Sequence, residues 1–237
     1  MTDLVPVLPW LFGLAVVAVL VVGFVLERKR REHLLLFATR RGWRYVGEDP
    51  SLAQRFDGTP FGRGERRRAR NVLTGTESGR PFTAFDYSYE THSTDSKGHR
   101  STQTHRFAVC AVPLPAPVGV LEVAPEGVLS RAAGAVGLVQ DIDLESEGFN
   151  RRFSVRAADR KLASDVLTPR TMQYLESVRP AAWRLQGAHV VSWRSGRLDP
   201  AEVVRTCAVL CRVVDGIPSF VWKDAGTRLA GGYDPRP

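Results

Sequence analysis

Residues 5–26 read VPVLPWLFGLAVVAVLVVGFVL, and none of these side chains is charged. As a helix with a rise of about 1.5 Å per residue, this stretch would be about 33 Å long. That length covers the hydrocarbon core of a bilayer, which is about 30 Å thick. Pro6 and Pro9 fall in the first turns of the helix, where a missing N–H group does little harm. The stretch therefore predicts a transmembrane helix that tethers the chain to a membrane.

The charges that flank this stretch predict its orientation. Four basic residues, 28–31, follow Glu27, whereas Asp3 is the one charged side chain before the stretch. Because basic residues stay on the cytoplasmic side, we expect residues 1–4 outside the cell and the rest of the chain inside, in a single-pass plasma-membrane protein. A cleaved signal peptide is disfavoured, because it would carry its basic residues before the apolar run. The uncharged length also disfavours a buried helix of a soluble protein.

The remainder of the 237-residue chain has the composition of a globular protein, with 43% hydrophobic and 24% charged residues. Residues 27–42 predict a basic juxtamembrane helix, and residues 43–222 predict a cytoplasmic α+β domain. This domain is either a single unit or a pair of packed subdomains, 43–124 and 125–222. Residues 223–237 are rich in glycine and proline and predict a disordered tail.

The net charge of +8 comes mostly from arginine and favours an anionic partner. For a membrane-anchored chain the nearest anionic partner is the inner-leaflet lipid surface. Nucleic acid is a less favoured alternative, and GC-rich codons are another source of arginine. The three cysteines, Cys110, Cys207 and Cys211, form no disulfide framework, which agrees with a reducing cytoplasm.

Two segments, 82–92 and 102–112, alternate between apolar and polar residues and predict the strands of an antiparallel hairpin. Phe85, Tyr87 and Phe107 lie on matching faces of this hairpin. Such a face is typical of the core of a half-buried sheet. The expected fold is therefore α+β, with an N-terminal transmembrane helix followed by an antiparallel β-meander that is packed with helices.

Proline and glycine residues predict where other strands end. Prolines at 113, 115 and 117 predict the end of the second hairpin strand, because proline cannot donate to a sheet ladder. Residues 118–123 predict a further strand. Gln186-Gly187 separates two apolar runs and predicts another hairpin. Capping residues and helical periodicity predict helices over residues 32–41, 50–56, 125–137, 159–167, 169–178 and 200–215.

Residues 58–70 read GTPFGRGERRRAR and predict a loop rich in glycine and arginine. Its arginines are candidate contacts for an anionic surface. A solvated loop, or pairing with the acidic DIDLESE stretch (residues 141–147), is the alternative. The glycines do not form a nucleotide-binding loop, because no Lys-Ser/Thr pair follows them. The five candidate side chains are Arg63, Arg66, Arg67, Arg68 and Arg70.

Other residues with chemical potential are better explained by structure. His92, His99 and His105 match no zinc-binding spacing and are expected at a solvated hairpin end. Cys207 and Cys211 are four residues apart on an apolar helix face, where cysteine packs as a small hydrophobe. The chain contains no G-x-S-x-G, HExxH or Walker motif. We therefore predict no catalytic residue, cofactor or metal ligand.

Several stretches resemble a family of uncharacterised, single-pass, membrane-anchored proteins from high-GC Gram-positive bacteria. They are GWRYVGEDPSLAQRF, GTPFG, GRPFTAFDYSYET, THRFAV, LEVAPEG, FNRRFSVRAADRKLASDVLTP and the closing WR…W pattern. The resemblance covers nearly all of the chain after the apolar stretch. It implies one anchored module and carries no activity, substrate or site residue.

The sequence thus favours a membrane-anchored, non-enzymatic binding module whose partner is a protein or the anionic lipid surface. The alternative is a membrane-associated enzyme, hydrolase-like, with a substrate that the sequence does not name. Nucleic-acid binding rests on charge alone. Neither the pathway nor the oligomeric state follows from these patterns.

Overall fold

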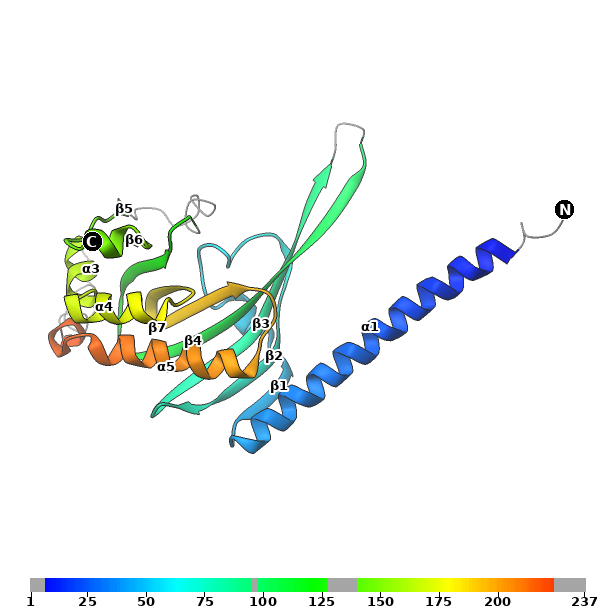
Figure 1. Cartoon of the computed structure of the whole chain (residues 1–237), viewed down its shortest axis with the longest axis horizontal. Coiled ribbons are helices and arrows are strands. Elements are labelled where there is room, and N and C mark those ends of the chain that lie inside the picture. The colour runs from blue at the N-terminus through cyan, green and yellow to red at the C-terminus, as the bar shows by residue number, and fades with distance from the viewer. Residues whose placement is uncertain (1–6, 95–97, 128–139, 224–237) are drawn as a thin grey trace, which may run out of the picture. The chain divides into compact units, whose positions relative to one another are not determined.

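The first part of the chain, Met1–Tyr45, is dominated by one helix, α1 (Val7–Arg40) (Figure 1). The sequence suggested a second, separate helix over residues 32–41. The helix instead continues without a break, because the intervening Glu, Arg and Lys residues are good helix formers. It ends as expected at Gly42, which has φ 69°, and the Trp43 N–H donates to the Ala38 carbonyl.

The computed structural model describes residues 7–94, 98–127 and 140–223. Within these ranges, no helix is both long enough and apolar enough to cross a bilayer. The predicted α+β class with an N-terminal helix is confirmed, whereas the predicted membrane span stays a prediction. The helix expected at residues 125–137 and the tail expected at 223–237 lie largely outside the described residues.

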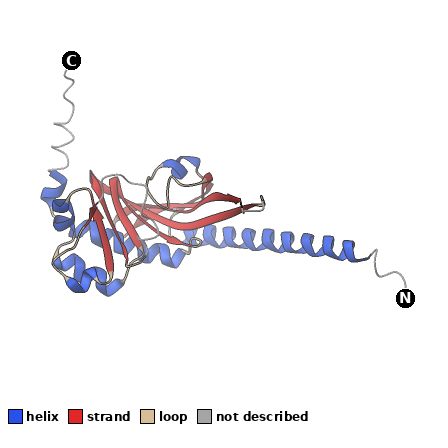
Figure 2. Ribbon diagram, turned by 90° about the horizontal axis from the view of Figure 1, so that it is seen from above, coloured by secondary structure: helices blue, strands red, loops and turns tan. Residues whose placement is uncertain are grey.

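The second unit, Val46–Pro237, is built on an antiparallel sheet whose strand order is β1-β2-β3-β4-β6-β5, with β7 paired to β4. Ser78 and Gly79, both with positive φ, form the tight turn between β2 and β3. Figure 2 shows the helices of this unit packed against the strands. The strands are β1 (Arg44–Glu48), β2 (Glu65–Glu77), β3 (Arg80–Thr94), β4 (Arg100–Pro125), β5 (Gln140–Asp141), β6 (Phe153–Ala157) and β7 (Ala182–Ser195).

Two strands are longer than the sequence predicted. β4 continues through the three prolines, and β7 continues through Gly187 where a hairpin turn was expected. The two strands pair with each other on both sides of these positions, and the register shifts between Pro113 and Val118. Gly187 has φ 54° and pairs with Val118. Proline and glycine therefore produce a bulge between two long strands, because each strand supplies the partner that the other needs.

Four of the helical elements begin directly after a capping side chain. The Asp49, Asp159, Thr168 and Asp199 side chains each accept a hydrogen bond from a backbone N–H of the first turn. α5 lies against β4, where the Cys110 and Cys207 sulfur atoms are 3.1 Å apart. The helical elements are η1 (Pro50–Gln54), α2 (Glu147–Asn150), α3 (Arg160–Val166), α4 (Pro169–Val178) and α5 (Pro200–Gly216).

The predicted core face of the β3–β4 hairpin is confirmed. Tyr87 pairs with Phe107 and Phe85 with Val109 in the sheet register. Phe85 and Tyr87 are fully buried, whereas Phe107 is only partly buried at the margin of the same cluster. The aromatic alternation therefore forms core, and its edge reaches solvent at Phe107.

This difference in burial predicts the stability of two alanine variants. Phe85→Ala should lower the free energy of unfolding by about 3–5 kcal/mol, because it leaves a cavity in a closed core. Phe107→Ala should lower it by clearly less, because part of that ring is already in contact with water. Urea unfolding of both variants, followed by circular dichroism, measures the difference. Equal losses would contradict this description of the core margin.

Candidate functional site

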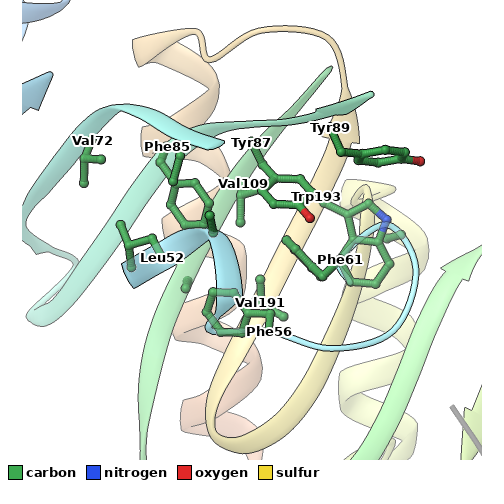
Figure 3. Packing of buried hydrophobic residues seen from close by; sticks show 14 of the residues in the cluster. Leu52, Phe56, Phe61, Val72, Phe85, Tyr87, Tyr89, Val109, Val191 and Trp193 are labelled. Carbon is green, nitrogen blue, oxygen red and sulfur yellow. The ribbon is translucent and has the colours of Figure 1, made fainter. Parts of the chain in front are cut away.

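A loop that follows η1 crosses the face of the sheet and supplies two rings to the core. The Phe61 ring lies 5.1 Å from the Tyr87 ring and 5.9 Å from the Trp193 ring, centroid to centroid (Figure 3). The Phe56 ring lies 5.4 Å from the Phe61 ring. These rings belong to one buried cluster, so the loop is anchored to the sheet by apolar packing.

The buried Arg184 also holds this loop on the sheet. Its guanidinium donates to the backbone carbonyls of Asp57 and Thr59, and the second of these bonds measures 2.9 Å. It also donates two hydrogen bonds to one Glu122 carboxylate oxygen, at 3.0 and 2.7 Å. The guanidinium carbon lies 4.9 Å from the centroid of the Trp193 ring. One side chain therefore joins β7, β4 and the loop.

This ion pair was not predicted, although the sequence contains a signal for it. Arg184 stands between Trp183 and Leu185, and Glu122 stands between Leu121 and Val123. A charged residue with apolar neighbours on both sides of a strand is unusual unless a partner neutralises it. Arg184 and Glu122 are 1% and 7% exposed, so each needs the other.

The candidate arginines were predicted in a loop over residues 58–70, but β2 already begins at Glu65. Arg66, Arg67, Arg68 and Arg70 therefore belong to a strand, in which successive side chains point to opposite faces. A register shift between Glu65 and Arg68, with φ 49° at Arg66, marks a bulge within this segment. The strand assignment spreads the predicted cluster over two faces of the sheet.

Arg63 and Arg67 lie on the aromatic side of the sheet. Burial raises the pKa of the Tyr87 hydroxyl, and the Arg67 charge partly offsets this increase. Burial raises the pKa of Tyr89 in the same way, and the Arg63 charge partly offsets it. Both tyrosines therefore remain neutral at physiological pH, beside two exposed guanidiniums.

Arg68 lies on the opposite side, in a row with Arg106, which was not among the predicted contact residues. In the sheet register Arg68 pairs with Ser88, and Ser88 pairs with Arg106. Directly paired residues present their side chains on the same face, so both arginines flank Ser88. Arg68, Arg106 and the neighbouring Arg194 of β7 are exposed.

The other two candidate arginines are engaged in surface ion pairs. The Arg66 guanidinium lies 3.4 Å from the Glu90 carboxylate, and the Arg70 guanidinium lies 3.5 Å from the Glu48 carboxylate. Such exposed pairs contribute about 0–1 kcal/mol to stability, but they reduce the charge available to a partner. Among the described residues, Arg63, Arg67 and Arg68 take part in no ion pair.

The histidines of the β3–β4 hairpin contact threonines. His92 Nδ1 lies 2.9 Å from Thr102 Oγ1, and His105 Nε2 lies 2.9 Å from Thr91 Oγ1. Within residues 7–94, 98–127 and 140–223, no group of three or more His, Cys, Asp or Glu side chains is arranged to hold a metal ion.

The three cysteines are buried in the core. The hydrogen bond with Cys207 and burial together raise the pKa of Cys110 well above its ordinary value. Burial raises the pKa of Cys211 to about 11. Both thiols therefore remain protonated at neutral pH, which makes them poor nucleophiles.

One carboxylate of the acidic DIDLESE stretch forms an ion pair with the neighbouring strand β6. Asp141 accepts a 2.7 Å bond from Arg156 of β6. Arg66 and Arg70 pair instead with Glu90 and Glu48, so the acidic stretch is not the partner in these two ion pairs.

The fold of this chain is similar to that of a solved structure, the crystal structure of the mycobacterial trehalose monomycolate transport factor A, TtfA. The superposition covers 87% of this chain and 97% of the other, with a TM-score of 0.56 and 13% sequence identity. No family model matches the sequence, and no curated protein matches it. At this identity the likeness concerns the fold alone. It defines the class of the molecule as an α+β protein with a shared architecture.

The buried ion pair allows a test of how the loop is held. Arg184→Met should lower the free energy of unfolding by about 3–5 kcal/mol, because it leaves the Glu122 carboxylate buried without a partner. The double variant Arg184→Met/Glu122→Leu should recover much of this loss, since it removes both charges. Thermal and urea unfolding of the variants measure the effect. If the double variant is no more stable than Arg184→Met, the loss of stability comes mainly from the missing contacts to the loop and not from the unpaired Glu122 carboxylate.

Proposed function

We propose that this chain is a membrane-anchored, non-enzymatic interaction module. The observation that carries the proposal is the apolar surface of α1. Every residue from 13 to 26 is exposed, and the Leu14, Val19 and Phe24 side chains are 68%, 71% and 70% exposed. A continuous apolar surface of this kind is unfavourable in water and favours a lipid environment.

The likeness of fold supports a more particular role. The neighbouring structure is named as a mycobacterial trehalose monomycolate transport factor. The two chains share an architecture over most of their lengths. We therefore propose that this chain serves as an accessory factor at a membrane, one that binds another protein or a lipid surface. The mycobacterial source of that structure also agrees with the proposed family from high-GC Gram-positive bacteria.

The alternative is a membrane-associated enzyme, which would need a pocket with convergent catalytic side chains. One pocket lies between α4 and α5 and another beside β5 and β6, and neither of these is lined by histidine or cysteine. Assays of the purified chain with generic ester and phosphoester substrates test this alternative directly.

The anchor predicts the behaviour of charged variants of α1. Val17→Arg/Leu20→Arg should move the chain from the membrane fraction to the soluble or aggregated fraction, because each arginine at the centre of a span costs about 2.5–3.5 kcal/mol. Leu35→Arg/Leu36→Arg is the matched control, since both leucines are exposed on α1 beyond the basic run. Carbonate extraction of cell membranes measures the distribution. Retention of Val17→Arg/Leu20→Arg in the membrane fraction would contradict the proposal that α1 anchors the chain.

The basic run after the apolar stretch predicts an external N-terminus and a cytoplasmic domain. A Ser219→Cys variant should resist a membrane-impermeant maleimide in intact cells and react after lysis. The native cysteines can stay in place, because all three are buried. A Thr2→Cys variant should react without lysis if the helix crosses the bilayer. Protection at both positions would indicate a helix that lies on the inner surface.

Anionic lipid is the partner that the arginines favour. Arg63, Arg66, Arg67, Arg68 and Arg70 remain the proposed contacts, and the three without ion pairs among the described residues contribute most. A basic side chain near an anionic surface gains about 1 kcal/mol, and physiological salt screens this attraction beyond about 8 Å. Since these residues occupy two faces of the sheet, a single flat membrane would contact one face more than the other.

Hydrogen exchange of the full chain in lipid nanodiscs can identify this face. Amides of residues 58–64 should exchange more slowly in anionic than in neutral nanodiscs, and high salt should abolish the difference. Arg63→Gln/Arg67→Gln removes charge from the aromatic side, and Arg68→Gln/Arg106→Gln removes it from the other side. Arg66→Gln/Arg70→Gln is the control that removes arginines already in ion pairs. Exchange that is independent of lipid charge would favour a protein partner.

A further inference from the structure

A pocket between the first turn of α4 and the last turn of α5 is separate from the surfaces described above. The two helices lie side by side in the fold (Figure 1). The pocket has a volume of about 190 Å³. This is several times the share of one water molecule, about 30 Å³, and less than the roughly 300 Å³ at which pockets for drug-sized ligands begin. It is lined by Thr168, Arg170, Thr171, Tyr174, Arg212, Asp215 and Gly216.

The charges in this pocket are not balanced. Asp215 is the one acidic residue of the lining, and its Oδ1 accepts two hydrogen bonds from Arg80, at 2.7 and 3.1 Å. The Asp215 charge is thereby neutralised by a residue that is not part of the lining. Within residues 7–94, 98–127 and 140–223, Arg170 and Arg212 form no ion pair. Two guanidiniums therefore line one small pocket without a counterion.

The position of Arg170 adds to this imbalance. Arg170 follows Pro169 in the first turn of α4, where the helix dipole disfavours a cation. Arg212 lies in the turn before the last turn of α5, where the helix dipole has little effect. Helix electrostatics therefore explains neither of these two arginines.

Neutral hydroxyl groups complete the lining. Burial raises the pKa of Tyr174, and the Arg212 charge partly offsets this increase, so the hydroxyl stays protonated at neutral pH. Thr168 already accepts the hydrogen bond of the Thr171 N–H and lies 3.0 Å from the Thr171 hydroxyl. The pocket therefore relies on the arginine side chains and the tyrosine hydroxyl, and the capped end of α4 contributes little.

We propose that the pocket between α4 and α5 binds a phosphate dianion, either free or as the terminal group of a phosphomonoester. Guanidinium groups donate paired hydrogen bonds that match the geometry of phosphate oxygens, and Arg170 and Arg212 would supply them from two helices. The dianion compensates both guanidinium charges, which have no ion-pair partner among the described residues. Arg80 acts as a positioning residue, because it keeps the Asp215 carboxylate from repelling the ligand.

The test uses the full chain in a neutral detergent, with inorganic phosphate as the probe. Isothermal titration at constant ionic strength should show binding, and Arg170→Gln or Arg212→Gln should weaken it at least about tenfold, because each removes a charged hydrogen bond. Arg194→Gln, at an exposed arginine of β7, is the matched control and should bind phosphate normally. Glycerol 3-phosphate in place of phosphate distinguishes a phosphomonoester from the free ion.

A second pair of variants tests the role of Arg80. Arg80→Gln should weaken phosphate binding although Arg80 does not line the pocket, and Arg80→Gln/Asp215→Asn should restore it by removing the exposed carboxylate. A purely structural role for Arg80 would not produce this rescue. No phosphate binding at millimolar concentration, or equal binding by Arg170→Gln, Arg212→Gln and Arg194→Gln, would overturn the proposal.

Discussion

The ion pair between Arg184 and Glu122 is the interaction on which the organisation of the domain depends. Both residues are buried, and the guanidinium satisfies a carboxylate and two backbone carbonyls at once. Burial of either charge alone would be strongly unfavourable, so the pair forms only when β7, β4 and the loop are all in place. Because an incomplete ion pair is unfavourable, it couples the folding of β7, β4 and the loop, which are far apart in the sequence.

The apolar cluster and the arginine segment both follow from this coupling. The loop carries Phe61 into the cluster and leads directly into Arg63 and β2. The position of the loop on the sheet therefore decides that Arg63 and Arg67 lie beside the tyrosines. Once β2 begins, strand geometry places Arg68 on the other side. A basic segment that is compact in sequence thus becomes two basic surfaces in the fold.

The long strand β4 shows how tertiary pairing overrides local signals. The prolines at 113, 115 and 117, near its centre, predicted an end to the strand, since proline interrupts a ladder. β4 nevertheless pairs with β3 and β7 before them and with β6 and β7 after them. The interruption is absorbed as a bulge opposite Gly187. In the same way, the predicted turn at Gln186-Gly187 becomes the middle of one strand, because β4 offers it a continuous partner.

The sequence by itself determined the features that depend on neighbouring residues. The helix caps, the Ser78-Gly79 turn, the alternation of Phe85 and Tyr87, and the apolar character of α1 all follow from local chemistry and periodicity. Only the tertiary structure decided which charges are compensated: Arg184 by Glu122, Asp215 by Arg80, and Arg66 by Glu90. These partners are 62, 135 and 24 residues apart, and no local pattern encodes such pairings. The physical reason is that an ion pair depends on distance in space, which the packing of the sheet sets, whereas caps and periodicity depend on distance along the chain.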